Sequence, residues 1–102
     1  MSSSFVHLHV HTDNSMLDGA ARIGGLLDEV VAQQMPAIAM TDHGTLFGAF
    51  EMWKQAKDRD IKAIIGLEAY FAPEGRHHKK PVQWTDGGEN DVSARGAYTH
   101  LT

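Results

Sequence analysis

The stretch that decides the fold is AIAMTDHG, at residues 37–44. Its first four residues are all apolar, which is typical of a short parallel strand that is covered on both faces. Pro36 precedes the stretch and predicts the end of a helix. Asp42 and His43 follow the strand directly. In parallel α/β folds the loops at the carboxyl ends of the strands form the binding crevice, so this end of the strand is expected to be functional.

Helical patterns flank this strand on both sides. Apolar residues recur at helical spacing from about Ala20 to Met35, although Gly24 and Gly25 weaken the first turn. A second amphipathic pattern begins after residue 44, and we expect its apolar stripe to pack in the core rather than to stack on bases. The residues of that stripe are Leu46, Phe47, Phe50, Trp53 and Ala56.

Two further strands are predicted outside these helices. The sequence FVHLHVH at residues 5–11 alternates strictly, so an extended strand would carry His7, His9 and His11 on one face. The sequence IKAIIGLEAY at residues 61–70 predicts the third strand. The resulting order β-α-β-α-β implies an α/β fold with a parallel sheet and right-handed crossovers.

Composition limits the class of protein and the kind of site. The 102 residues suffice for one small domain, and the formal net charge of −4 argues against a protein held on nucleic acid mainly by a basic surface. A nuclease is still compatible with this charge, because bound cations would add positive charge. The chain has no cysteine, so any metal site must be built from histidine and carboxylate. With no signal-peptide pattern and no apolar run long enough to cross a bilayer, a cytoplasmic location is expected.

Each predicted strand ends in residue types that bind metal ions or transfer protons. In chain order they are His9 and His11, then Asp42 and His43, then Glu68. Imidazoles and carboxylates without thiolates suit Zn²⁺, Mn²⁺ or iron, and such ligands can bridge more than one ion. Asp18, in the loop after the first strand, lies on the same edge of the predicted sheet and could add a ligand.

Each of these residues also has a plainer interpretation. His9 and His11 could form a half-exposed surface pair, and Asp42 could cap the helix that follows it. Glu68 is the hardest to explain in this way, because a lone carboxylate in a buried apolar strand is costly unless it is paired or bound to a metal. His7 is expected to support the site or to pack in the core rather than to bind metal itself.

The chain is expected to divide into a βαβαβ core at residues 1–72, a polar loop at residues 73–96 and the start of another ordered element at residues 97–102. The loop is longer than most connections inside compact domains. His77 and His78 lie among basic residues in it, and a solvated loop is their expected setting.

Several segments, in this order, resemble the motifs of the polymerase and histidinol phosphatase (PHP) family of metal-dependent phosphoesterases. They are residues 5–12, 15–19, 39–44, 65–70 and 98–101. The segments are most similar to the branch of the family found in bacterial replicative DNA polymerases, and to actinobacterial members in particular. His7 fits that branch, because many stand-alone members have Asp at this position. The resemblance covers nearly the whole chain.

The resemblance implies a distorted (β/α)7 barrel that holds up to three divalent ions, with Glu68 as a bridging ligand. The implied metal ligands are His9, His11, Asp18, His43, Glu68 and His100. A barrel needs about 200 residues or more, so this chain would supply the N-terminal β-α-β-α-β portion of a larger protein. The remaining ligands would then lie beyond Thr102, and this portion alone is expected to have little or no activity.

The function implied for the longer protein is 3′→5′ exonuclease proofreading within a DNA-directed DNA polymerase. Catalysis would depend on His9, His11, His43 and Glu68 as metal ligands. The substrate would be the primer 3′ end of DNA, and the expected partners are other replicase subunits, such as the sliding clamp or a proofreading subunit, with no membrane. Two alternatives stay open: a stand-alone phosphoesterase of the histidinol-phosphatase type, and a non-catalytic, metal-braced scaffold within the polymerase.

Overall fold

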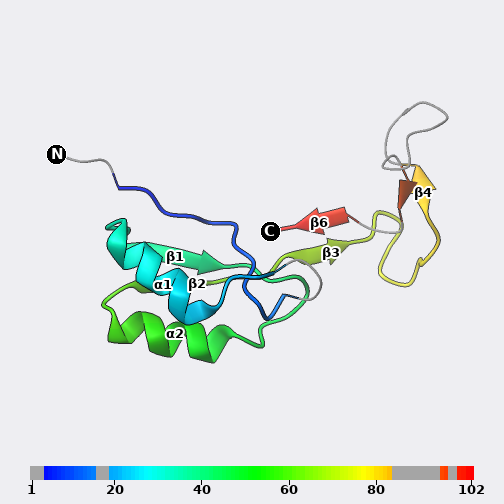
Figure 1. Cartoon of the computed structure of the whole chain (residues 1–102). Helices are drawn as coiled ribbons and strands as arrows, with labels where there is room; N and C mark the ends of the chain where they lie inside the picture. The colour runs from blue at the N-terminus through cyan, green and yellow to red at the C-terminus, as the bar shows by residue number, and fades with distance from the viewer. Residues whose placement is uncertain (1–3, 16–18, 84–94, 97–98) are drawn as a thin grey trace. The chain divides into compact units, whose positions relative to one another are not determined.

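A computed structural model of the chain describes residues 4–15, 19–83, 95–96 and 99–102, which are drawn in colour in Figure 1. Contacts divide the chain into a first unit, residues 1–68 with Thr102, and a second unit, residues 69–101. Neither helix in the described ranges is long and apolar enough to cross a membrane.

The first unit is built from two helices and two parallel strands. Their order is α1 (Ile23–Ala32), β1 (Ala37–Met40), α2 (Ala49–Asp58) and β2 (Lys62–Ile65). β1 and β2 pair in parallel, from Ala37 opposite Lys62 to Met40 opposite Ile65, and α2 forms the crossover between them (Figure 1). The α/β class and the strand predicted at residues 37–40 are confirmed, whereas a closed barrel stays an expectation.

The core of this unit lies where α1 and α2 pack on each other and on the two strands. All four residues of β1 are buried, as their uninterrupted apolar character predicts. α1 buries Ile23, Leu27 and Val30, which recur at intervals of four and three residues and so share one face of the helix. Met52 and Ala56 of α2 belong to the same buried cluster.

The apolar stripe that the sequence predicts for the second helix contains the wrong residues. Of its residues only Ala56 is buried, while Phe50 is 70% and Trp53 48% exposed. α2 begins at Ala49, so Leu46 and Phe47 precede the helix and do not continue its face. The helix turns Met52 and Ala56, four residues apart, toward β2 instead. Phe50 and Trp53 therefore lie on a flank of α2 that the described residues leave open to solvent.

The first predicted strand is also wrong. Residues 5–11 form no strand, although they run beside β1 and bond to it through two backbone amides. The amide of Ala39 donates to the carbonyl of His7 at 3.0 Å, and the amide of Thr41 donates to that of Val10 at 2.8 Å. The two donating amides are two positions apart, at Ala39 in β1 and at Thr41 just after it, whereas the two accepting carbonyls are three positions apart. This extra residue interrupts the regular ladder that a parallel pair requires.

The third predicted strand is divided. β2 ends at Ile65, and β3 (Ala69–Phe71) belongs to the second unit, where it pairs antiparallel with β6 (Thr99–Leu101). The segment predicted as a polar loop contains two further short strands, which pair antiparallel with each other: β4 (Val82–Gln83) and β5 (Arg95–Gly96).

Candidate metal centre

Three segments that are distant in the sequence meet at the carboxyl ends of β1 and β2. Glu68 lies at the centre, and its side chain is 6% exposed. His9 Nε2 lies 2.7 Å from Glu68 Oε2, and His11 Nε2 contacts the same carboxylate oxygen. These three donor atoms all lie within 4.8 Å of one another. The structure therefore brings together three side chains that the sequence places in distant segments.

His43 lies on the other side of the same carboxylate. Its Nδ1 is 3.8 Å from Glu68 Oε1, and its ring centroid is 4.2 Å from that of His11. The backbone fixes this arrangement, because His43 and Glu68 form an isolated parallel bridge. In it the amide of Glu68 donates to the carbonyl of Asp42 at 3.0 Å, and the amide of Gly44 donates to the carbonyl of Glu68 at 3.1 Å.

Gly44 makes this bridge geometrically possible. Its φ is +60°, in the left-handed region that side chains with a Cβ adopt at a cost. The chain turns here immediately after His43, and the amide of Gly44 is thereby aimed at Glu68. The glycine in the TDHG motif thus has a backbone reason that is separate from metal chemistry.

Asp42 does not cap the following helix, contrary to one of the predictions. α2 begins seven positions later, at Ala49, and its N-cap Gly48 makes no side-chain hydrogen bond. The fully buried carboxylate of Asp42 instead accepts two bonds from Thr12, one from the amide at 2.6 Å and one from the hydroxyl at 2.8 Å. Asp42 cannot cap α2 because the connection between β1 and α2 is too long to bring the two together.

The electrostatics of Glu68 are set by opposing effects. Burial by itself raises the pKa of the carboxyl group, but the hydrogen bonds to His9 and His11 and the nearby charge of His43 outweigh burial. Together they lower the pKa of Glu68 from 4.5 to about 2. The group is therefore an anion throughout the neutral range, which is the form that binds a cation.

The donor set fits a divalent metal ion. Two imidazole nitrogens and one carboxylate oxygen converge, and histidine with carboxylate is the ligand chemistry of Zn²⁺, Mn²⁺ and iron. His9 is 57% exposed at its side chain, whereas Glu68 is buried, so the cluster has a protein side and a solvent side. His9, His11 and Glu68 are the residues that could hold the ion, with His43 adjacent to them.

The other predicted site residues have different settings. Asp18 lies outside the described residues. His100 lies on β6 of the second unit, opposite Tyr70 of β3, and the two ring centroids are 5.2 Å apart. His7 is exposed and packs edge-on against Phe5, with ring centroids 4.7 Å apart.

Sequence reasoning missed two hydroxyl residues that bond to the segments carrying the histidines. Thr12 binds Asp42, and Ser15 Oγ accepts a bond from the amide of His43 at 3.0 Å. Both are buried. The available signal was their position, because polar residues that directly follow a pair of candidate ligands are well placed to fix them.

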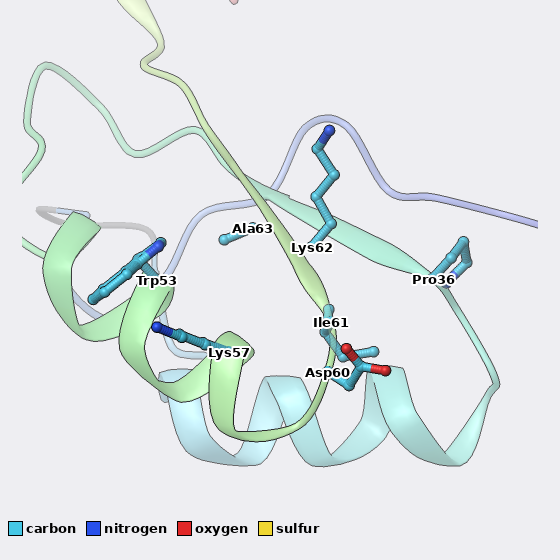
Figure 2. A pocket seen from close by; sticks show the side chains of 7 residues that line it. All are labelled: Pro36, Trp53, Lys57, Asp60, Ile61, Lys62 and Ala63. Carbon is cyan, nitrogen blue, oxygen red and sulfur yellow. The ribbon is translucent and has the colours of Figure 1, made fainter.

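The pocket drawn in Figure 2 is separate from this cluster. It has a volume of about 440 Å³ and lies at the other end of β2. Its lining residues are Pro36, Trp53, Lys57, Asp60, Ile61, Lys62 and Ala63. The lining contains no histidine and shares no residue with the cluster of His9, His11 and Glu68.

Comparison with known proteins gives a consistent family. Residues 7–102 match the sequence profile of the PHP domain. The chain is 58% identical to DNA polymerase III subunit alpha of Saccharopolyspora erythraea, over 96% of this chain and 9% of that protein. It is 54% identical to the same subunit of Mycobacterium tuberculosis H37Rv, over 98% and 9%, and 48% identical to that of Thermus aquaticus, over 96% and 8%. The chain thus spans less than a tenth of the length of these relatives.

Proposed function

Because this chain belongs to the PHP domain family, we propose that it supplies metal ligands to a phosphoesterase site that removes nucleotides from the 3′ end of DNA. The observation that carries the proposal is the meeting of His9 Nε2 and His11 Nε2 at one oxygen of the buried Glu68. A structural role alone does not require two imidazoles on a single carboxylate oxygen, whereas metal binding requires donors that converge on one point.

In this proposal the protein's own groups act by position and charge. His9, His11 and His43 would offer ring nitrogens to the ion, and Glu68 would offer an anionic carboxylate whose pKa its neighbours lower. Asp18 and His100 are proposed as further ligands on the strength of the family resemblance. A divalent ion bound there would supply Lewis-acid chemistry, which polarises a phosphodiester and makes a water molecule more acidic. In the reaction a water oxygen would bond to phosphorus and release a proton, the P–O3′ bond would break, and the departing 3′ oxygen would take up a proton.

The proposed substrate is a polynucleotide and not a small phosphate ester. All three relatives named above are polymerase subunits, and a polymerase holds a primer 3′ end as its working substrate. The exposed face of His9 would leave the cluster open to such an extended ligand. We propose on the same grounds that the chain acts as the N-terminal PHP segment of a polymerase III alpha subunit, among other replicase subunits.

The proposal is tested with the full-length native protein that carries this chain. Excision of a mismatched 3′ nucleotide is measured with Mn²⁺ or Zn²⁺ after removal of the proofreading subunit, for the wild type and for His9→Ala, His11→Ala and Glu68→Gln. We expect each variant to lose at least tenfold in excision rate while polymerisation is retained. His7→Ala is the matched control, since it removes an imidazole from the same segment at a position that packs on Phe5 instead.

Two outcomes would count against the proposal. Excision that is equal in the wild type and in all three variants would place the nuclease elsewhere. Stoichiometric metal binding with no metal-dependent excision would favour the alternative of a metal-braced scaffold, in which the ion only stabilises the polymerase.

A further inference from the structure

We propose that Asp42 and Thr12 form a buried positioning pair, which holds the segments of His11 and His43 against Glu68 without binding the metal ion. This inference rests on the proposed metal site. It assigns a role to a carboxylate that is neither a ligand nor a helix cap.

The burial and bonding of the pair show that it is built into the structure. Asp42 and Thr12 are both 0% exposed. A carboxylate removed from water needs partners for its oxygens, and here each oxygen accepts a bond from the same residue. Oδ1 accepts from the Thr12 amide at 2.6 Å, and Oδ2 accepts from the Thr12 hydroxyl at 2.8 Å. Two bonds to one partner fix the distance and the orientation of the two segments together.

The pair has a ligand next to each of its members. His11 precedes Thr12 in the sequence, and His43 follows Asp42. The carbonyl of Asp42 also accepts the amide of Glu68 at 3.0 Å. Asp42 therefore contacts the segment of His11 through its side chain and the segment of Glu68 through its backbone carbonyl. It belongs itself to the segment of His43. A shift at this residue would move His11, His43 and Glu68 relative to one another.

The turn after His11 reinforces the pair. Thr12 Oγ1 accepts the amide of Asn14 at 3.2 Å, while its own proton goes to Asp42. The amide of Ser15 donates to the carbonyl of Thr12 at 2.9 Å, and Ser15 Oγ accepts the amide of His43 at 3.0 Å. Thr12 is thus bonded on every polar atom, and its loop returns to the residue that follows Asp42.

A direct role of Asp42 in metal binding does not fit these contacts. Both of its oxygens are directed at Thr12, and neither atom belongs to the cluster of donors formed by His9, His11 and Glu68. Removing a group that hydrogen-bonds to a metal ligand and orients it typically weakens metal affinity by about 10–100-fold. That range sets the size of the effect that the pair should have.

The test measures the affinity for Co²⁺ of the full-length native protein that carries this chain, and the visible absorption of bound Co²⁺ reports its ligand geometry. Thr12→Val removes the hydroxyl and keeps the shape of the side chain and the backbone bond, and Thr12→Ser restores the hydroxyl. We expect Thr12→Val to weaken Co²⁺ binding at least tenfold and to alter the absorption spectrum. Thr12→Ser should stay within about threefold of the wild type. Asp42→Ala should be at least as severe, and Thr12→Val still tests the pair if Asp42→Ala does not fold.

A core variant separates positioning from general destabilisation. Leu27→Ala removes a fully buried side chain on α1 and should lower the unfolding temperature while leaving Co²⁺ affinity and spectrum unchanged in the folded chain. The inference is overturned if Thr12→Val binds Co²⁺ like the wild type, or if Thr12→Ser fails to restore binding. Absence of Co²⁺ binding by the wild type itself would instead refute the proposed metal site, so the two failures are distinguishable.

Discussion

The imidazole rings of His11 and His43 lie with their centroids 4.2 Å apart, although they come from different segments of the chain. Both rings adjoin the carboxylate of Glu68, which His11 contacts at Oε2 and His43 approaches at Oε1. Positive charge on both rings would be repulsive at this distance, and the buried anion opposes that repulsion. A cation held by His11 and Glu68 together with His9 would take the place of positive charge on the His11 ring.

Metal should stabilise the fold. A divalent ion that binds the folded chain and not the unfolded chain contributes about 2.7 kcal/mol when its free concentration is 100 times its dissociation constant. We expect Zn²⁺ or Mn²⁺ to raise the unfolding temperature of the chain, and a chelator to reverse the rise. Differential scanning calorimetry checks this, with His7→Ala as a control that should respond like the wild type. An equal rise in Glu68→Gln would contradict a site centred on Glu68.

In the metal-free chain, the contribution of Glu68 to the free energy of unfolding should be lost at acid pH. Its pKa is lowered in the folded state from 4.5 to about 2, so the unfolded chain takes up this proton first. The stabilisation is therefore complete above pH 4.5 and is lost as the pH falls toward 2. Urea unfolding of the chelated wild type and of Glu68→Gln should show a difference in free energy that narrows across this range. A difference that is constant from pH 6 to pH 3 would contradict the assigned pKa.

Truncation of the side chain should lower the stability of the fold at Met52 of α2 and leave it almost unchanged at Phe50, two positions earlier. Met52 is fully buried, so Met52→Ala should lower the free energy of unfolding by about 2–5 kcal/mol. Phe50 is 70% exposed, so Phe50→Ala should change it by no more than about 0.5 kcal/mol. Chemical denaturation of the two variants makes the comparison. Similar losses at both positions would mean that Phe50 packs in a core after all.

Replacing a glycine by alanine should lower the free energy of unfolding at one position and raise it at another. Gly44 has a φ of +60°, so Gly44→Ala should destabilise the chain by about 1–2 kcal/mol and displace the amide that meets Glu68. Gly25 lies within α1 with open space around the position of a Cβ, so Gly25→Ala should stabilise by about 0.5–1 kcal/mol. Denaturation midpoints give both values. A stabilising Gly44→Ala would show that the left-handed turn is not required.

Patterns of local chemistry predicted the parts of the fold that depend on a single segment. The apolar run at residues 37–40 has no polar face, which is typical of a strand covered on both faces, and it is β1. The periodicity before Pro36 gave α1, with the buried positions Ile23, Leu27 and Val30. The same approach failed for α2, because its apolar residues occupy more than one face and only packing against β2 selects Met52 and Ala56.

The sequence suggested the candidate ligands of the site, but not the residues that hold their segments in place. His9, His11 and Glu68 could be grouped from the sequence because each follows or ends an apolar run, where α/β folds place their sites. The strand that was expected to hold the first two does not form, since the two backbone bonds to β1 are separated by three residues on one side and two on the other. Thr12 and Ser15 were missed, because their partners lie in a different segment.

By itself the sequence predicted the candidate metal ligands and the order of the two helices and of the strand between them, because both depend on residue type and on local periodicity. Tertiary structure alone decided that Asp42 faces Thr12 rather than the start of α2, and that one carboxylate oxygen receives both His9 and His11. The physical reason is that hydrogen bonds between distant segments depend on where the backbone brings them, and a buried carboxylate takes whichever donors it meets there.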